Sequence, residues 1–63
     1  MTAVLYRAHL VDGTTKRVKV TTMPTAVYVE GDRYTCDPAE AVAAYGRSRG
    51  WTVVGVTAPQ GAR

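Results

Sequence analysis

The fold is decided by residues 4–20, which read VLYRAHLVDGTTKRVKV. Apolar and polar side chains alternate on both sides of Asp12 and Gly13, and this period of two predicts two half-buried strands joined by a turn. A two-residue turn would place Tyr6 opposite a lysine and would mix the two faces. A three-residue loop that starts one residue earlier places Tyr6 opposite Val18 and puts Gly13 in a left-handed conformation, which glycine adopts at little cost. Because the register decides which face meets the core, we expect the three-residue loop.

A second hairpin is predicted over residues 27–36 by the same alternation. We expect a two-residue turn of Gly31 and Asp32, since this turn gathers the apolar side chains on one face. The expected pairs are Val29 with Tyr34, Val27 with Cys36 and, beside the turn, Glu30 with Arg33. Tyr28 then falls on the opposite face.

One helix is predicted after the second hairpin. Asp37 can cap it, Pro38 suits its first position, and Glu40 completes a capping box. Gly50 fits the left-handed position that ends a helix, with the next residue, a tryptophan, folding back onto a tyrosine of the last turn. Within the helix, Gly46 is expected to reduce stability by up to about 1 kcal/mol relative to Ala. The residues expected to face the core are Ala41, Val42 and Tyr45, with Ala44 beside them.

A final strand is predicted over residues 51–57. Its adjacent Val53 and Val54 are typical of an interior strand covered on both faces, and a crossover through the helix should leave it parallel to the strand before the helix. Residues 58–63 are expected to form a disordered tail. The sequence thus predicts one α+β domain over residues 1–57: two β-hairpins, one α-helix and a final strand (ββββαβ), with the helix on one face of a mainly antiparallel sheet. In topology alone, this order resembles the trimmed RNase H-like fold of some small antitoxins.

The sheet face turned away from the helix is expected to be open and basic. Arg7 should lie opposite Arg17 on this face. The candidate binding residues are Arg7, His9, Arg17, Lys19 and Tyr28. A basic strip beside an exposed aromatic ring is how many sheets hold single-stranded nucleic acid, because cations follow the phosphates and the ring stacks on a base. The same side chains are also typical of an exposed face whose charges serve only to keep the protein soluble. Both interpretations stay open at this point.

No catalytic residue and no metal site are predicted. The chain has five acidic residues, and each has a structural role in the expected fold, at a turn, at a helix start or in a cross-strand pair. The single Cys36 is expected on the covered face and the single His9 on the open face, which separates a nucleophile from its base. The sequence has no zinc-binding cysteine pattern and no glycine-rich phosphate loop. We therefore expect no enzymatic activity, no cofactor and, because so short a chain seldom encloses a pocket, no small-molecule substrate.

Composition narrows the kind of partner. The 63 residues carry a net charge of +3, which favours an anionic partner. The apolar residues are small, with ten valines, nine alanines and no phenylalanine, so a partner or a second copy is favoured as a means of completing the fold. We expect a non-enzymatic protein-binding module of accessory, inhibitor or adaptor type that docks on a protein or on itself through a sheet edge. The alternative is a nucleic-acid-binding protein that uses the basic open face and favours single strands over duplexes.

Composition also bears on compartment and source. No stretch approaches the ~20 apolar residues that span a bilayer, and the first residues lack the uncharged apolar run of a secretory signal. A lone cysteine cannot form an internal disulfide. These features predict a cytoplasmic protein with no membrane partner. The absence of Phe, Ile and Asn, with six arginines against two lysines, indicates a GC-rich bacterial genome or a phage or mobile element within one.

Overall fold

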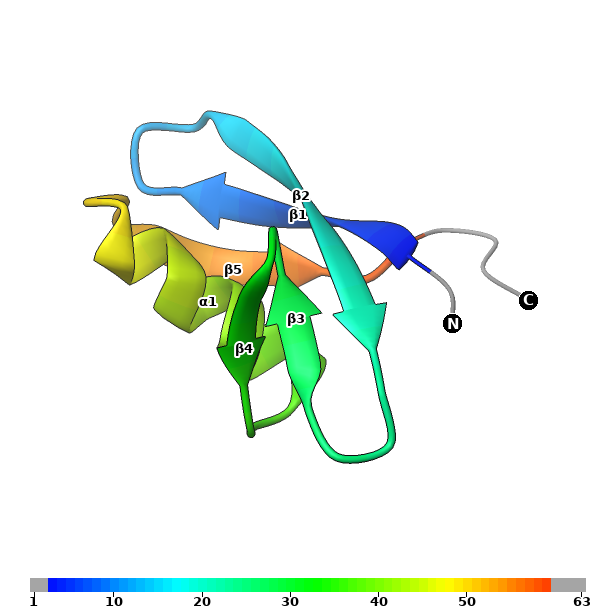
Figure 1. The fold of residues 1–63 in the computed structure, drawn as a ribbon. Coiled ribbons are helices and arrows are strands. Elements are labelled where there is room, and N and C mark those ends of the chain that lie inside the picture. Colours follow the sequence, from blue (N-terminus) through cyan, green and yellow to red (C-terminus); the bar gives the residue numbers. More distant parts are fainter. Residues whose placement is uncertain (1–2, 60–63) are drawn as a thin grey trace.

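Five strands and one helix make up the described part of the chain, residues 3–59 of a computed structural model (Figure 1). Along the chain the elements are β1 (Ala3–Leu10), β2 (Thr15–Thr22), β3 (Val27–Val29), β4 (Asp32–Tyr34), α1 (Pro38–Ser48) and β5 (Val53–Thr57). The strands form one sheet in the order β4-β3-β2-β1-β5, and each pair of neighbours is antiparallel. The predicted α+β fold and its order ββββαβ are confirmed. Of the tail expected to be disordered, residues 60–63 lie outside the described residues.

The first hairpin has the predicted register. Tyr6 lies opposite Val18, and Val4 lies opposite Val20. The Leu10 N–H donates to the Thr14 carbonyl at 2.9 Å, which closes a three-residue loop of residues 11–13. Its last residue, Gly13, has a φ of 91°, a backbone conformation that residues with side chains rarely adopt. The parity of the apolar residues therefore predicted this register correctly.

The second hairpin differs from the prediction by two residues. The observed pairs are Val27 with Tyr34, Tyr28 with Arg33, and Val29 with Asp32. The turn therefore consists of Glu30 and Gly31, whose φ values of 50° and 93° suit the left-handed turn that matches the twist of a tight hairpin. A shift of two residues preserves alternation, so the apolar residues still share one face. The expected cross-strand pair of Glu30 with Arg33 is wrong.

Cys36 lies beyond the end of β4 as a result of this register. It is exposed, whereas we predicted it on the covered face opposite Val27. The shorter β4 ends at Tyr34, and the chain then turns directly into α1. The prediction of a buried thiol was therefore wrong.

The helix begins and ends close to the predicted positions. Asp37 is the N-cap residue and Pro38 opens the helix, but the Asp37 side chain makes no capping hydrogen bond. This exposed carboxylate stays in solvent beside the positive end of the helix. At the other end, the Trp51 N–H donates to the Gly46 carbonyl at 2.8 Å and the Gly50 N–H to the carbonyl of residue 47 at 3.1 Å. These two bonds form the turn expected after a helix, and they fold Trp51 back so that its ring meets that of a tyrosine edge-on at 5.9 Å.

Gly46 is buried where α1 meets β5. A Cβ atom at this position would lie 2.6 Å from Val53 Cγ2 and 3.0 Å from Trp51 Cε3. Glycine is therefore required here by close packing, although it costs helix propensity. The predicted buried residues Ala41, Val42 and Tyr45 are confirmed, and Gly46 is the buried residue that the prediction lacked.

β5 is an edge strand, not the interior strand that was predicted. Within residues 3–59 it pairs with β1 alone, and Val54 is 64% exposed. A register shift between His9 and Leu10 of β1, as at a bulge, lets Val53 and Val56 both pack against the core and leaves Val54 outside. β5 and β4 do run in the same direction, but they lie at opposite edges with three strands between them. The two hairpins pair sequentially, which leaves the outer sides of β1 and β4 free, and the last strand pairs with β1.

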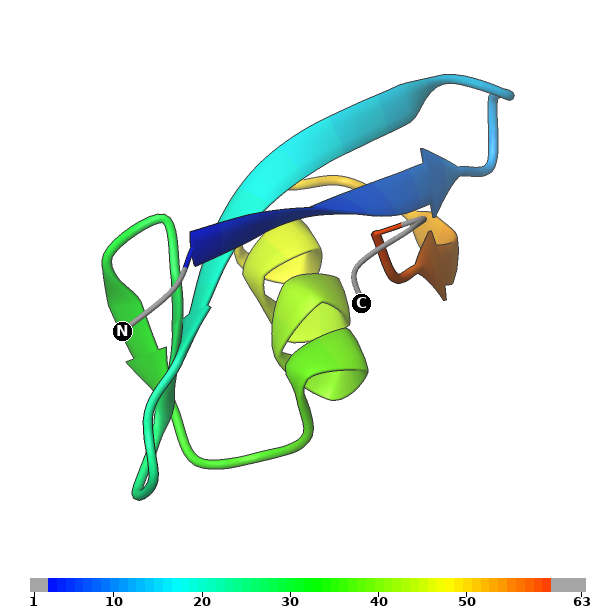
Figure 2. The same ribbon diagram turned by 90° about the vertical axis from the view of Figure 1, so that its right-hand side faces the viewer.

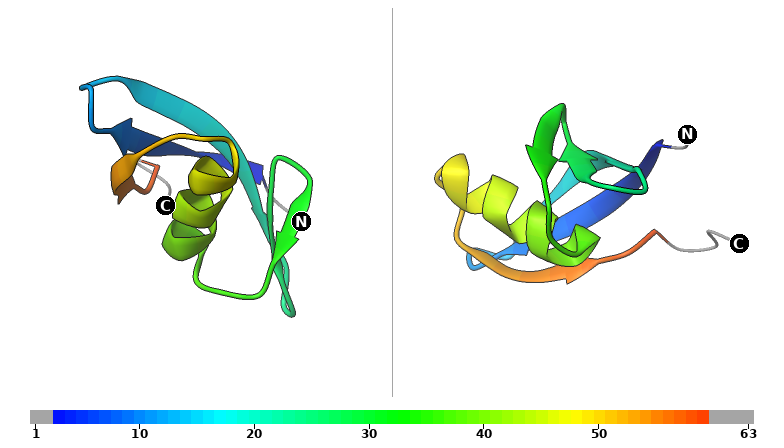
Figure 3. Two further views of the ribbon diagram at one scale, coloured as in Figure 1. Left: turned by 90° about the vertical axis from the view of Figure 1, so that its left-hand side faces the viewer. Right: turned by 60° about the horizontal axis from the view of Figure 1, so that its bottom comes forward.

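The core lies between α1 and the sheet. The buried apolar residues are Ala8, Val18, Val20, Ala26, Val27, Val29, Ala41, Val42 and Tyr45. The sheet curls around the helix, so that α1 lies between β5 on one side and the hairpin of β3 and β4 on the other (Figures 2 and 3). One side of the sheet is thereby covered, and the other faces solvent.

Candidate binding face

The open face of the sheet is the side turned away from α1. Side chains alternate across a strand, and Ala8, Val18 and Val20 point into the core. Their neighbours along β1 and β2 therefore point outward. The five predicted binding residues, Arg7, His9, Arg17, Lys19 and Tyr28, all belong to this face; the three cations are exposed, while the histidine and the tyrosine are half-buried.

Arg7 and Arg17 form a cross-strand pair of like charge in the middle of the open face. They lie directly opposite each other, as predicted, and Thr57 of β5 lies opposite Arg7 on its other side. Two cations placed opposite each other reduce sheet stability by roughly 0.2–1 kcal/mol. Lys19 lies further along β2 opposite Leu5, which is 51% exposed. The cations thus follow the two longest strands.

Arg33 joins the open face beside Tyr28. The observed register places these two residues directly opposite each other on β3 and β4. Tyr28 also lies opposite Thr21 on β2, so its two cross-strand neighbours are Thr21 and Arg33. The sequence-based prediction paired Arg33 with Glu30 instead of Tyr28 because it placed the turn one residue too late. The preference of left-handed turns for glycine at their second position was the signal that could have identified it.

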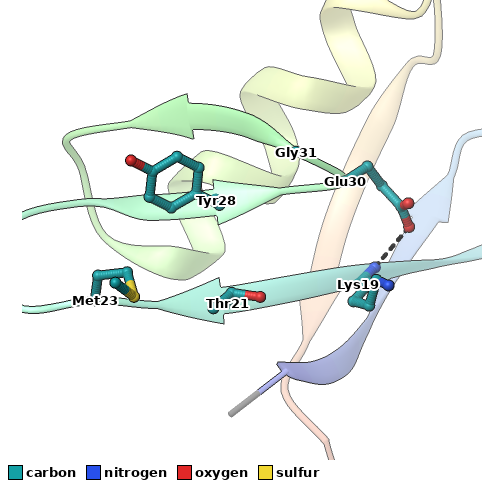
Figure 4. A pocket seen from close by; sticks show the side chains of 6 residues that line it. All are labelled: Lys19, Thr21, Met23, Tyr28, Glu30 and Gly31. Carbon is teal, nitrogen blue, oxygen red and sulfur yellow. Dashed lines mark hydrogen bonds between the residues drawn. The ribbon is translucent and has the colours of Figure 1, made fainter. Parts of the chain in front are cut away.

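A hollow of about 590 Å³ opens beside Tyr28. It is lined by Lys19, Thr21, Met23, Tyr28, Glu30 and Gly31, with the aromatic ring projecting from β3 (Figure 4). At one end the Glu30 carboxylate accepts a hydrogen bond of 2.7 Å from the backbone N–H of Lys19. The hollow therefore combines an aromatic wall with a carboxylate that is held in place.

His9 is held by neighbours rather than solvated. Its Nε2 atom is hydrogen-bonded to the Thr57 hydroxyl, and its Nδ1 atom lies 3.4 Å from the Thr15 hydroxyl. It remains on the open face, as predicted, but β5 runs beside it and covers it in part.

The described residues show few groups suited to acid, base or metal chemistry. Over residues 3–59, no group of three His, Cys, Asp or Glu side chains could hold a metal ion. The hydroxyl of Thr14 donates to Asp12 at 2.6 Å and its backbone N–H donates at 3.0 Å; these bonds, the hydroxyl first, lower the pKa of the Asp12 carboxyl below its ordinary value. Asp12 thus has the turn role predicted for it, and the Glu30 carboxylate bonds to the backbone of β2.

Comparison with known proteins gives no relative from which a function could be transferred. The chain matches no family model, and neither a curated protein nor a solved structure matches it significantly. In the part of the chain that the structure describes, no helix is long and apolar enough to cross a membrane. The residues of the open face are therefore the basis on which a function is proposed.

Proposed function

We propose that this protein is a non-enzymatic module that binds single-stranded nucleic acid on the open face of its sheet. The observation that carries this proposal is the cross-strand pair of Tyr28 with Arg33, on the same face as Arg7, Arg17 and Lys19. Aromatic rings on a sheet stack with unpaired bases, while neighbouring cations follow the phosphates. The net charge of +3 favours the same class of ligand.

The pair of Arg7 and Arg17 supports this proposal independently. Like charges placed opposite each other are unfavourable in the free protein. A phosphate between the two guanidinium groups would accept charge-assisted hydrogen bonds from both and would offset that repulsion. The arrangement therefore suits an anion better than it suits a face that only needs to stay soluble.

Single strands are the better fit than duplexes. A tyrosine ring can stack on a base only if that base is not already stacked between its neighbours in a duplex, and the bases of a single strand meet this condition. Within residues 3–59, the helix α1 carries one basic residue, Arg47 in its last turn, and so offers little positive charge for docking in a duplex groove. We place the protein in the cytoplasm, where the exposed Cys36 would stay reduced.

Fluorescence anisotropy with a labelled single-stranded DNA, the same RNA sequence and a DNA duplex tests the proposal. The single strands should bind more tightly than the duplex, and affinity should fall steeply as salt is raised. Arg17→Ala should weaken binding for all sequences and reduce the salt slope by about one. Arg47→Ala is the matched control, because it removes an exposed arginine from α1 and not from the open face.

Tyr28 has its own pair of variants. Tyr28→Leu should weaken single-strand binding by about fivefold or more, since base stacking contributes about 1–3 kcal/mol. Tyr28→Phe keeps the ring and should retain the affinity. If no nucleic acid binds even at low salt, the proposal is wrong.

A second candidate is association through the outer edge of β5, either with a second copy or with another protein. No charged residue occurs from Trp51 to Pro59, and Val54 is 64% exposed. The opposite edge, β4, is three residues long and carries Asp32 and Arg33. Short and charged edges resist pairing, whereas uncharged edges invite it. A second copy is the simplest partner, because an uncharged strand can pair antiparallel with itself.

Sedimentation over a wide range of protein concentration tests this second candidate. Pairing of two five-residue strands should bury less than about 1,000 Å², which is typical of a weak dimer. Val54→Lys should shift the equilibrium toward monomer. Val11→Lys, at a position 68% exposed in the first hairpin loop, is the matched control and should leave it unchanged. A protein that stays monomeric at its highest soluble concentration would exclude self-pairing.

A further inference from the structure

We propose that Glu30 makes the hollow beside Tyr28 prefer bases that carry an exocyclic amino group, such as cytosine, over those that carry a carbonyl in its place, such as uracil. This inference rests on the proposed binding of single strands. It concerns which bases the hollow accepts, a property that charge and stacking alone do not determine, since every base has a face that can stack.

The Glu30 carboxylate is fixed at the end of the hollow by the backbone of β2. Its Oε2 atom accepts a hydrogen bond of 2.7 Å from the Lys19 N–H (Figure 4). The Glu30 N–H also donates to the Lys19 carbonyl at 2.9 Å. Glu30 also occupies the first position of the turn, with a φ of 50°. The backbone N–H and the side-chain carboxylate of Glu30 are thus both hydrogen-bonded to the backbone of Lys19, which limits the freedom of the side chain.

The other carboxylate oxygen is the one that can meet a ligand. No hydrogen bond to this atom occurs among residues 3–59. A carboxylate offers acceptors and no donor. It therefore attracts an amino group, and it repels both a base carbonyl and a phosphate. Phosphates are expected at the arginines of the open face, and the hollow is left for a base.

Tyr28 and Glu30 border the hollow from two positions of the same face, and their backbones are about 7 Å apart along an extended chain. The Tyr28 ring and the Glu30 carboxylate lie toward opposite ends of the hollow (Figure 4). A pyrimidine stacked on the Tyr28 ring would therefore direct its exocyclic group along the hollow toward Glu30. The hollow of about 590 Å³ has ample room for a base in that position.

Anisotropy with labelled oligo(dC) and oligo(dU) of equal length tests the preference at one salt concentration and neutral pH. The two bases differ at C4, where cytosine has an amino group and uracil a carbonyl, and at the neighbouring N3, which carries a hydrogen in uracil and none in cytosine. We expect oligo(dC) to bind about fivefold or more tightly than oligo(dU), since a well-formed base contact discriminates by this much.

Glu30→Gln should reverse the preference. The Lys19 N–H needs an acceptor, so the glutamine carbonyl takes that bond and the amide NH₂ group turns toward the hollow. This donor favours the uracil carbonyl over the cytosine amino group. Glu40→Gln makes the same change of charge on an exposed residue in the first turn of α1 and should keep the preference for oligo(dC). Thermal unfolding of both variants checks that the fold is retained.

The outcomes separate this inference from the proposed function. If both oligonucleotides bind equally and Glu30→Gln changes nothing, the role of Glu30 is wrong while single-strand binding stands. If Glu30→Gln and Glu40→Gln strengthen both ligands to the same extent, Glu30 acts only through its charge, and the base preference is overturned. If neither oligonucleotide binds, the proposed function fails and this inference fails with it.

Discussion

The two faces of the sheet are made by the same strands from opposite kinds of side chain. Under α1, Ala8, Val18 and Val20 are at most 2% exposed, and each is small. On the other side, one residue away along the chain, Arg7 and Arg17 lie opposite each other in solvent. On the face under α1, the volume of each side chain is limited by the core, whereas the open face is distinguished by its positive charge. Variants on the two faces should therefore affect different measurements.

Val20→Ala should produce the largest loss of stability. Val20 is fully buried on β2, the central strand of the sheet. Removing two buried methyl groups and leaving a cavity should lower the free energy of unfolding by about 2–3 kcal/mol. Urea unfolding, monitored through the fluorescence of Trp51, measures this loss of stability. The control is Val54→Ala on the exposed edge, which should change stability by less than about 0.5 kcal/mol; equal losses for the two variants would contradict the difference between core and surface.

Gly46→Ala should have the next largest effect on the free energy of unfolding, and the sign of that change is informative. Helix propensity alone would favour alanine by about 1 kcal/mol. The added Cβ would lie 2.6 Å from Val53 Cγ2, on a β-branched side chain that has little freedom to move. We expect a net loss of about 1–2 kcal/mol in the same urea experiment. A gain in stability would show that β5 moves away from α1 at little cost.

Arg7→Thr should change stability slightly and in the opposite direction. Removing one member of the like-charged pair should raise the free energy of unfolding by roughly 0.2–0.5 kcal/mol, more at low salt than at high salt. The same substitution should weaken binding to single-stranded DNA. Arg47→Thr serves as the comparison, since it lies on α1. If Arg7→Thr lowers both stability and affinity, the arginine is a structural residue and not a binding residue.

The smallest effect on stability should come from Asp12, and it should appear as a dependence of stability on pH. The Thr14 bonds lower its pKa in the folded protein, so the folded state favours the charged carboxylate. This contribution is present above the ordinary carboxyl pKa and is lost as the pH falls through the lowered folded-state pKa. Unfolding of the wild type and of Asp12→Asn should therefore differ by a constant amount near neutrality and converge in acid. A difference that grows as the pH falls would mean that the assigned direction is wrong.

Most of the candidate face could be predicted from the sequence because it follows from alternation. Arg7, Arg17 and Lys19 were placed correctly, since the apolar residues between them can point only to the core. Tyr28 was placed correctly for the same reason. Arg33 was given the wrong cross-strand partner, because two turns, one residue apart, satisfied the same apolar pattern. The hollow was not predicted either, because it forms only where the turn brings a carboxylate against β2.

The sequence by itself determined the local elements: the hairpin around Gly13, the start of α1 at Pro38 and its end just before Gly50. These depend on contacts between residues close in the chain, which composition and spacing reveal. Only the tertiary structure decided that β5 lies at an edge, that Gly46 must be a glycine and that Glu30 faces Lys19. Each of these depends on which distant segments meet, and many such pairings satisfy one apolar pattern until the volume of the core selects one of them.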